Sequence, residues 1–230
     1  MGSYLNPGNF SFRGSLRSKI YVDKSELIAK TNEALCTEQR YICVSRPRRF
    51  GKSMAANMLA AYYDRSENIE ELFRNLAISK DSSYKENLNQ YDVIKINMQE
   101  FLSMSGTMEE MLEMLKKYIV LDFEETYPQV RFRDEKNLIQ VMKDVFSYTR
   151  CPFVILIDEW DCLFREYKQD REAQKKYLDF LRAWLKDQDN VAFAYMTGIL
   201  PIKKYGSHSA LNMFTEYSIC LLYTSDAADD

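Results

Sequence analysis

Apolar and polar residues recur along the chain with two periods, which predict helices interleaved with short strands. Apolar spacing of three and four positions, or a high content of Ala, Met and Leu, indicates helices at residues 23–35, 53–64, 107–127, 134–148 and 171–187. Short apolar runs predict strands at residues 41–44, 93–96, 153–157 and 191–196. Helices that alternate with apolar strands are typical of an α/β fold, here a three-layer sandwich with a mostly parallel sheet.

Capping residues sharpen the ends of two of these helices. Asp23 is expected to be the N-cap of the first helix, because its side chain can accept from free N–H groups of the first turn. Thr107 and Glu110 have the spacing of a capping box at the start of the longest helix, which Pro128 must end. No internal repeat and no linker rich in Pro, Gly and Ser divides the sequence into domains.

The composition is that of an ordinary globular protein. Lys and Arg number 31, and Asp and Glu 34, among 230 residues, which gives a formal net charge of −3. This balance provides no general attraction to nucleic acid or to an anionic membrane. No apolar run approaches the ~20 residues that span a bilayer, and the first residues lack the blocks of a signal peptide. We therefore expect a cytoplasmic protein with no membrane partner.

Cysteine and histidine usage excludes several kinds of site. The cysteines are widely spaced, without a C-x-x-C pair, at Cys36, Cys43, Cys151, Cys162 and Cys220. His208 is the only histidine in the sequence, so a zinc cluster, a Ser-His-Asp triad or a Cys-His pair has too few candidates. We expect reduced, mostly buried thiols.

A candidate phosphate-binding loop, of the Walker A kind, lies between the first strand and the second helix. It consists of Arg46, Pro47, Arg48, Arg49, Phe50, Gly51, Lys52 and Ser53. Gly51 would let the backbone approach the phosphates closely, at the N-terminus of a helix. Lys52 would reach the β- and γ-phosphates, and the Ser53 hydroxyl would coordinate Mg²⁺. Arg46 replaces the first glycine of the usual G-x-x-x-x-G-K-[ST] pattern, so the alternative is an arginine-rich solvated turn.

Two carboxylates, in the manner of a Walker B motif, follow the apolar run at 153–157. Asp158 and Glu159 stand at the end of a buried strand, where charged groups are costly unless something pairs with them. A bound Mg²⁺ and an activated water would supply that pairing. Asp158 would hold the coordination sphere of the metal, and Glu159 would orient or deprotonate the attacking water. The alternative is a carboxylate pair that only caps the following segment.

Two further strands complete the expected arrangement. The strand at 93–96 falls between the loop and the carboxylates in the sequence. We therefore expect another strand to lie between the strand that precedes the loop and the strand that precedes the carboxylates. Phosphate-loop ATPases with an added strand and a catalytic Glu after the metal-site Asp have this arrangement. In that class the next strand ends in a polar residue that senses the γ-phosphate, and here the candidate is Thr197. The alternative for Thr197 is a helix or turn cap.

Five segments carry a pattern known from a protein family: Tyr21 to Lys24, Arg46 to Ser53, Leu72 to Leu76, Ile157 to Asp161, and Thr197 to Pro201. In these segments the sequence resembles the AAA-ATPase-like family of bacterial proteins, which reads RPRRFGK[ST] at the loop. The likeness covers roughly residues 10–219, and Arg46 in place of glycine agrees with it. It implies ATP binding and hydrolysis in an additional-strand phosphate-loop fold. Family members usually continue into a lid and a C-terminal nuclease-like domain of the PD-(D/E)xK type.

Some residues near these motifs have several interpretations. The loop arginines would neutralise nucleotide phosphates, act on the nucleotide of a neighbouring subunit, contact nucleic acid, or pair with surface carboxylates. Tyr21 and Asp23 precede the loop by one helix, and we expect them to pack it rather than to contact a nucleotide base. We expect structural roles for Trp160, Asp161 and Trp184.

The end of the chain departs from the family pattern. Residues 220–230 resemble translated sequencing-adapter read-through. We therefore expect residues 1–219 to form the ATPase-like domain, cut before its lid and C-terminal domain, and residues 220–230 to be a non-native tail.

Two functions from different classes follow from these motifs. The first is an Mg²⁺-dependent ATPase that acts as a nucleotide-driven switch, with Lys52 and Glu159 as catalytic residues. The second is a nucleotide-gated interaction module of a defence or mobile-element system, with little or no turnover. A small-molecule kinase is less favoured, because no acceptor site can be identified. A homo-oligomer, and nucleic acid bound through a missing C-terminal domain, stay open as partners.

Overall fold

Five parallel strands form one sheet within residues 2–202 and 210–217, which the computed structural model describes. The strands are β1 (Tyr41–Ser45), β2 (Asp92–Asn97), β3 (Phe153–Asp158), β4 (Val191–Gly198) and β5 (Thr215–Tyr217). Their order across the sheet is β2-β3-β4-β1-β5, and all neighbours are parallel. Burial of β3 and β4 on both faces explains the continuous apolar runs in the sequence.

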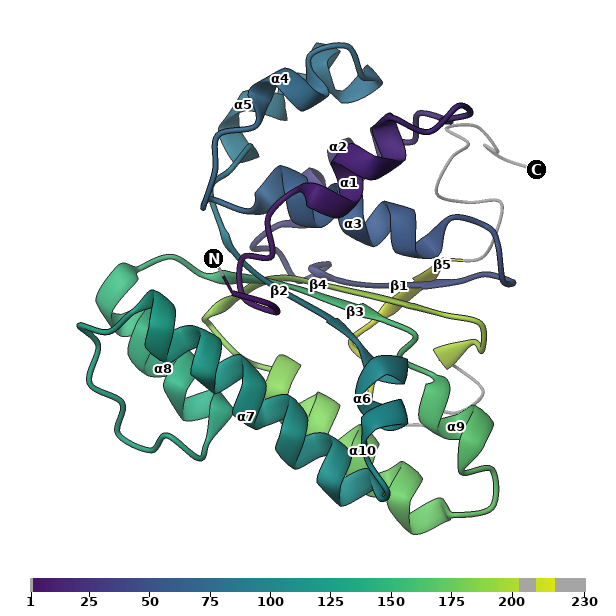
Figure 1. Ribbon diagram of the computed structural model, residues 1–230, viewed down its shortest axis with the longest axis vertical. Helices are drawn as coiled ribbons and strands as arrows, with labels where there is room; N and C mark the ends of the chain where they lie inside the picture. The colour runs from purple at the N-terminus through teal and green to yellow at the C-terminus, as the bar shows by residue number, and fades with distance from the viewer. Residues whose placement is uncertain (1, 203–209, 218–230) are drawn as a thin grey trace.

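Helices cover both faces of this sheet (Figure 1). One layer holds α1 (Phe10–Leu16), α2 (Glu26–Ala34), α3 (Lys52–Tyr63), α4 (Glu70–Phe73), the 3-10 helix η1 (Ala77–Lys80) and α5 (Tyr84–Asn87). The other layer holds α6 (Met98–Met104), α7 (Met108–Thr126), α8 (Leu138–Thr149), α9 (Cys162–Glu166) and α10 (Arg171–Leu185). The predicted three-layer α/β sandwich is confirmed.

Each face of the sheet packs against its own apolar core. Alternate residues of β3 divide between the two cores. Ile155 and Ile157 pack with the layer that contains α7, whereas Val154 and Leu156 pack with the layer that contains α3. All four side chains are buried, and full burial of a side chain of this size contributes about 1.5–3 kcal/mol. The sheet is therefore held from both sides, which fixes the position of its strand ends.

The strand that separates β1 from β3 is β4, which is hydrogen-bonded to both. A strand does separate them, as predicted. The prediction is drawn from the strand at 93–96, however, and that strand is β2, which lies beyond β3 at the edge of the sheet. The N-terminal segment covers that edge: Lys95 N donates to Tyr4 O at 2.8 Å, and Asn6 N donates to Val93 O at 2.7 Å.

The predicted helices and strands are all present, although several of their ends differ. Thr107 is the N-cap of α7 and accepts from Glu110 N at 3.2 Å, as expected. The prediction for Asp23 is wrong, because the N-cap position of α2 is Ser25. The Asp23 carboxylate accepts instead from Ser25 N at 2.8 Å and from the N–H of the first residue of η1 at 2.7 Å. Asp23 therefore joins α2 to η1, a contact between distant segments.

The cysteines of the described residues are thiols, and none forms a disulfide. Cys43, Cys151 and Cys162 are buried, and Cys36 is exposed. Burial raises the pKa of the Cys162 thiol to about 12, so this thiol is protonated at neutral pH. Cys220 and the expected tail at 220–230 lie outside the described residues. In the part of the chain that the structure describes, no helix is long and apolar enough to cross a membrane.

Candidate functional site

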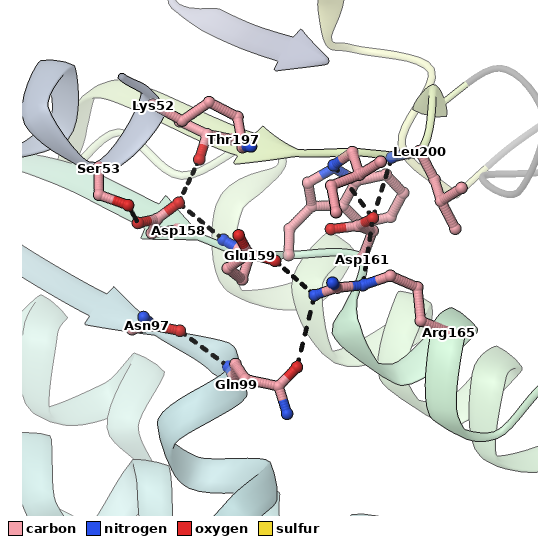
Figure 2. A network of polar contacts seen from close by, with 12 residues as sticks. Lys52, Ser53, Asn97, Gln99, Asp158, Glu159, Asp161, Arg165, Thr197 and Leu200 are labelled. Carbon is pink, nitrogen blue, oxygen red and sulfur yellow. Dashed lines mark hydrogen bonds and ion pairs between the residues drawn. The ribbon is translucent and has the colours of Figure 1, made fainter. Parts of the chain in front are cut away.

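The carboxyl ends of β1, β4 and β3 meet at one edge of the sheet, where open α/β sheets place their ligands. Figure 2 shows Lys52, Ser53, Asp158, Glu159 and Thr197 gathered at this edge. Lys52 and Ser53 begin α3, Asp158 ends β3, and Thr197 is the penultimate residue of β4. The sequence predicted each of these five residues for one site, and the fold brings them together.

The loop between β1 and α3 makes a sharp turn. Gly51 has a φ of 77° and Arg49 a φ of 70°, both in the left-handed region. Glycine adopts this conformation without strain, which explains a glycine at the entry to α3. Arg46 N donates to Gly198 O at 3.0 Å, so the backbone of Arg46 continues the pairing of β1 with β4. The Arg46 side chain is buried, and the next four residues are exposed: Pro47, Arg48, Arg49 and Phe50.

Lys52 places a cation inside the curve of this loop. The residue is only 7% exposed. Its Nζ donates to Arg46 O at 3.1 Å and to Pro47 O at 3.2 Å, and it forms no ion pair with a carboxylate among the described residues. A buried ammonium group whose partners are neutral carbonyls is costly. The loop therefore fits an anion such as a phosphate group.

Asp158 is the centre of the hydrogen bonds at this edge of the sheet, and it is buried. Ser53 Oγ donates to Asp158 Oδ2 at 2.5 Å. Thr197 Oγ1 donates to Asp158 Oδ1, which also accepts from Glu159 N at 3.0 Å. Thr197 thus contacts the carboxylate directly and does not cap a turn. The sensing of a γ-phosphate by Thr197 stays a prediction.

Asp158 and Ser53 together offer oxygen ligands of the kind that Mg²⁺ prefers. No three His, Cys, Asp or Glu side chains in the described ranges lie close enough to form a ready-made metal cage. Mg²⁺ usually binds through one or two protein oxygens and completes its octahedron with phosphate and water. The residues present therefore fit Mg²⁺ bound together with a phosphate group, rather than alone.

Glu159 occupies a strained turn directly after β3. Its φ of 54° lies in the left-handed region, which is unusual for a residue with a side chain. Three hydrogen bonds of 3.0 Å hold the turn: Glu159 N to Asp158 Oδ1, Trp160 N to Thr197 O, and Cys162 N to Glu159 O. The Glu159 side chain points toward α9, on the side away from Ser53 (Figure 2). Its direction is therefore set by the backbone and by what it meets on α9.

Arg165 of α9 contacts Glu159, and the sequence motifs did not predict this residue. Arg165 Nη2 donates to Glu159 Oε2 and, at 3.4 Å, to Gln99 Oε1. Its Nε lies 3.6 Å from Asp161 Oδ2. The side chains of Arg165 and Glu159 are 17% and 21% exposed, and that of Asp161 is fully buried. One signal was available in the sequence, because residues four apart, such as Asp161 and Arg165, share a helix face.

Gly198 leaves room for the two residues that follow Glu159. A Cβ atom at Gly198 would lie 2.7 Å from Asp161 Oδ1 and 2.7 Å from both Cδ1 and Nε1 of Trp160. Asp161 Oδ2 accepts from Ile199 N at 3.1 Å and from Leu200 N at 2.9 Å, so it holds the chain after β4. Trp160, Asp161 and Trp184 are all buried, which agrees with the structural roles expected for them.

An apolar pocket of about 290 Å³ lies beside the loop. Tyr21, Phe50 and Met54 are among the residues that line it. Burial raises the pKa of the Tyr21 hydroxyl to about 12. Lys24 also lines the pocket, 3.5 Å from the point where a Cβ at Gly51 would lie, and its pKa is lowered by burial and by the charge of Arg46. Tyr21 therefore lies beside the loop, as expected, and also lines a cavity, whereas the Asp23 carboxylate bonds the start of η1 and not the loop.

Comparisons with known proteins agree with this geometry. Residues 12–207 match the AAA-ATPase-like family, described as predicted AAA-ATPases. The chain is 23% identical over 214 residues to the uncharacterized protein in the vnfD 5′ region of Azotobacter chroococcum mcd 1, covering 89% of this chain and 38% of that protein. The chain therefore spans well under half the length of this relative.

A solved structure of PCH-2 from C. elegans also matches, although only weakly. The match is 17% identical, covers 84% of this chain and 40% of that chain, and has a TM-score of 0.32. This score is too low to assign a shared fold, so the assignment depends on the family match, which extends over most of the sequence. The chain belongs to the AAA-ATPase-like family.

Proposed function

We propose that this protein is an Mg²⁺-dependent ATPase that acts as a nucleotide-driven switch. The observation that carries the proposal is the meeting of Lys52, Ser53, Asp158 and Glu159 at one edge of the sheet. The family description, predicted AAA-ATPase, supports nucleotide binding.

The triphosphate would bind at the loop between β1 and α3. The first N–H groups of α3, a helix of 12 residues, carry partial positive charge and are free to donate to phosphate oxygens. Lys52 would exchange its two backbone carbonyl partners for phosphate oxygens. This exchange is favourable, because the ammonium group would then face anionic oxygens instead of neutral carbonyls, which adds attraction between opposite charges. Arg48 and Arg49 add positive charge on the exposed side of the loop.

Ser53 and Asp158 would hold Mg²⁺, which when bound neutralises charge that develops on the transferred phosphoryl group. Glu159 would orient the attacking water and accept its proton. Thr197, whose hydroxyl already contacts Asp158, would respond to a γ-phosphate at this edge of the sheet.

The apolar pocket beside the loop would take the nucleobase, which adds a base contact to the packing role expected for Tyr21. Tyr21 and Phe50 offer aromatic faces, and base–aromatic stacking is worth about 1–3 kcal/mol. The pocket and the loop share Gly51 and Phe50 in their walls, so one ligand can reach both. A nucleoside triphosphate has this combination of a flat apolar base and an anionic tail.

The Glu159→Gln variant tests hydrolysis. It should bind ATP with unchanged affinity and lose about 10²–10⁴-fold in turnover, because the amide cannot accept the proton of the water. Phosphate release and fluorescent-nucleotide binding are measured in parallel. Glu113→Gln is a matched control, since that exposed carboxylate pairs with Lys116 on the surface of α7, away from the candidate site. Unchanged turnover in Glu159→Gln would remove the assignment of Glu159.

A second candidate function is a nucleotide-gated interaction module of a defence or mobile-element system. The contact of Arg165 with Glu159 favours it, because a restrained base gives little turnover. Steady-state phosphate release distinguishes the two candidates. We extend the same proposal to a cytoplasmic homo-oligomer. Nucleic acid would be bound by a further domain of the whole protein, since this chain spans 38% of its relative.

A further inference from the structure

The carboxylate that would activate water is already engaged by a guanidinium group. Arg165 Nη2 donates to Glu159 Oε2, and Figure 2 shows the carboxylate turned toward α9 and away from Ser53. The guanidinium N–H occupies one acceptor site of the carboxylate and holds it on the α9 side, away from Ser53 and the place where an attacking water would lie. Both side chains are largely buried, at 17% and 21% exposure, so solvent screens their attraction less than at the surface.

The backbone of Glu159 cannot easily move the carboxylate by itself. Its left-handed turn is held by the hydrogen bond of its N–H with Asp158 Oδ1 and by that of its C=O with Cys162 N. A change of position must therefore come from rotation of the Glu159 side chain, and the contact with Arg165 opposes that rotation.

Arg165 keeps other partners when Glu159 leaves. Its Nε lies 3.6 Å from the carboxylate of Asp161, which is fully buried, and Gln99 Oε1 lies 3.4 Å from its Nη2. A guanidinium that loses its only carboxylate in a buried site pays the full cost of desolvation, whereas this one stays compensated. In the structure Arg165 is shared by Glu159 and Asp161, and rotation of the Glu159 side chain would leave it paired with Asp161.

We infer that Arg165 is a positioning residue that restrains Glu159 and thereby limits the rate of ATP hydrolysis. The inference rests on the proposed function, because it concerns the same base. Asp161 also holds the N–H groups of Ile199 and Leu200, so the segment after β4 and the restraint on Glu159 share one carboxylate. A movement of that segment would change the partner available to Arg165.

The test compares ATP turnover by the 230-residue chain with that of Arg165→Ala and Arg165→Lys. Arg165→Ala should raise kcat by about fivefold, which corresponds to ~1 kcal/mol, and should leave KM unchanged. Arg165→Lys keeps the charge but lacks the planar fork, so its kcat should lie between the two. Arg74→Ala is the matched control, because Arg74 forms an exposed pair with Glu71 on α4, remote from the site.

A folded Arg165→Ala protein that binds ATP and has an unchanged or lower kcat would overturn the inference. If that variant does not fold, an Arg165→Lys kcat at or below the wild-type value has the same meaning. Adding Glu159→Gln to Arg165→Ala should abolish the gain, since the gain depends on the released carboxylate. If no protein in the series turns over ATP, the proposed hydrolysis fails and the inference falls with it. If wild-type turnover depends on Glu159 and does not rise without Arg165, the inference alone fails.

Discussion

One methyl group at Gly198 is expected to destabilise the protein and to disturb the candidate site. In Gly198→Ala the new Cβ would lie 2.7 Å from one atom of Asp161 and from two atoms of Trp160, whereas real Cβ atoms essentially never approach within 3.0 Å. Both neighbours are fully buried and cannot swing into solvent. Overpacking of this kind costs about 1–3 kcal/mol, and each kcal/mol lowers Tm by roughly 2–4 °C for a protein of this size.

The chain contains a control with the opposite expected sign. A Cβ at Gly14, in the middle of α1, would meet nothing within 4 Å. Gly14→Ala should therefore stabilise the protein by about 0.5–1 kcal/mol, through the higher helix propensity of alanine. Urea and thermal unfolding followed by circular dichroism give both values. The packing account of Gly198 is wrong if Gly198→Ala is as stable as wild type, or if the two variants lose stability equally.

Two further predictions concern the ligands. Lys52→Ala should weaken ATP binding by at least about tenfold, because a hydrogen bond to a charged group is worth roughly 1.5–3 kcal/mol. Lys30→Ala, which removes an exposed lysine of α2, should leave ATP affinity unchanged. Isothermal titration calorimetry compares the two variants, and equal affinities would contradict the role of Lys52. Chelation of divalent cations should stop phosphate release and added Mg²⁺ should restore it. Turnover that persists in excess chelator would exclude the proposed ligation by Ser53 and Asp158.

Much of the fold could be predicted from local patterns. The run from Phe153 to Ile157 is apolar at every position because both faces of β3 are covered, and this pattern depends on no distant residue. The loop and the carboxylates were also readable, since each lies where a strand ends. Helices of four to seven residues, such as α4 and α9, were not predicted, because they contain too few turns to show a helical period.

The unpredicted parts of the site depend on how distant segments meet. Arg165 reaches Glu159 only because the turn at residues 159–161 directs α9 back toward the end of β3. Lys24 lies near Gly51 because the segment before α2 packs against the loop. Asp23 has the residue type of an N-cap, but one of its two backbone partners lies at the start of η1, more than fifty positions away. Local pattern identifies such residues as polar and does not identify their partners.

The order of the strands explains why these residues can share one ligand. Neighbouring strands lie about 4.8 Å apart, so two strands with one between them end roughly 10 Å apart. With β4 between β1 and β3, the backbone ends of these two strands are separated by about that distance, and the side chains of Ser53 and Thr197 reach Asp158 by hydrogen bonds. If β1 and β3 were adjacent, the end of β4 would not lie between them, and Thr197 would lose its place beside Asp158. The inserted strand therefore does more than extend the sheet: it brings Thr197 to the site.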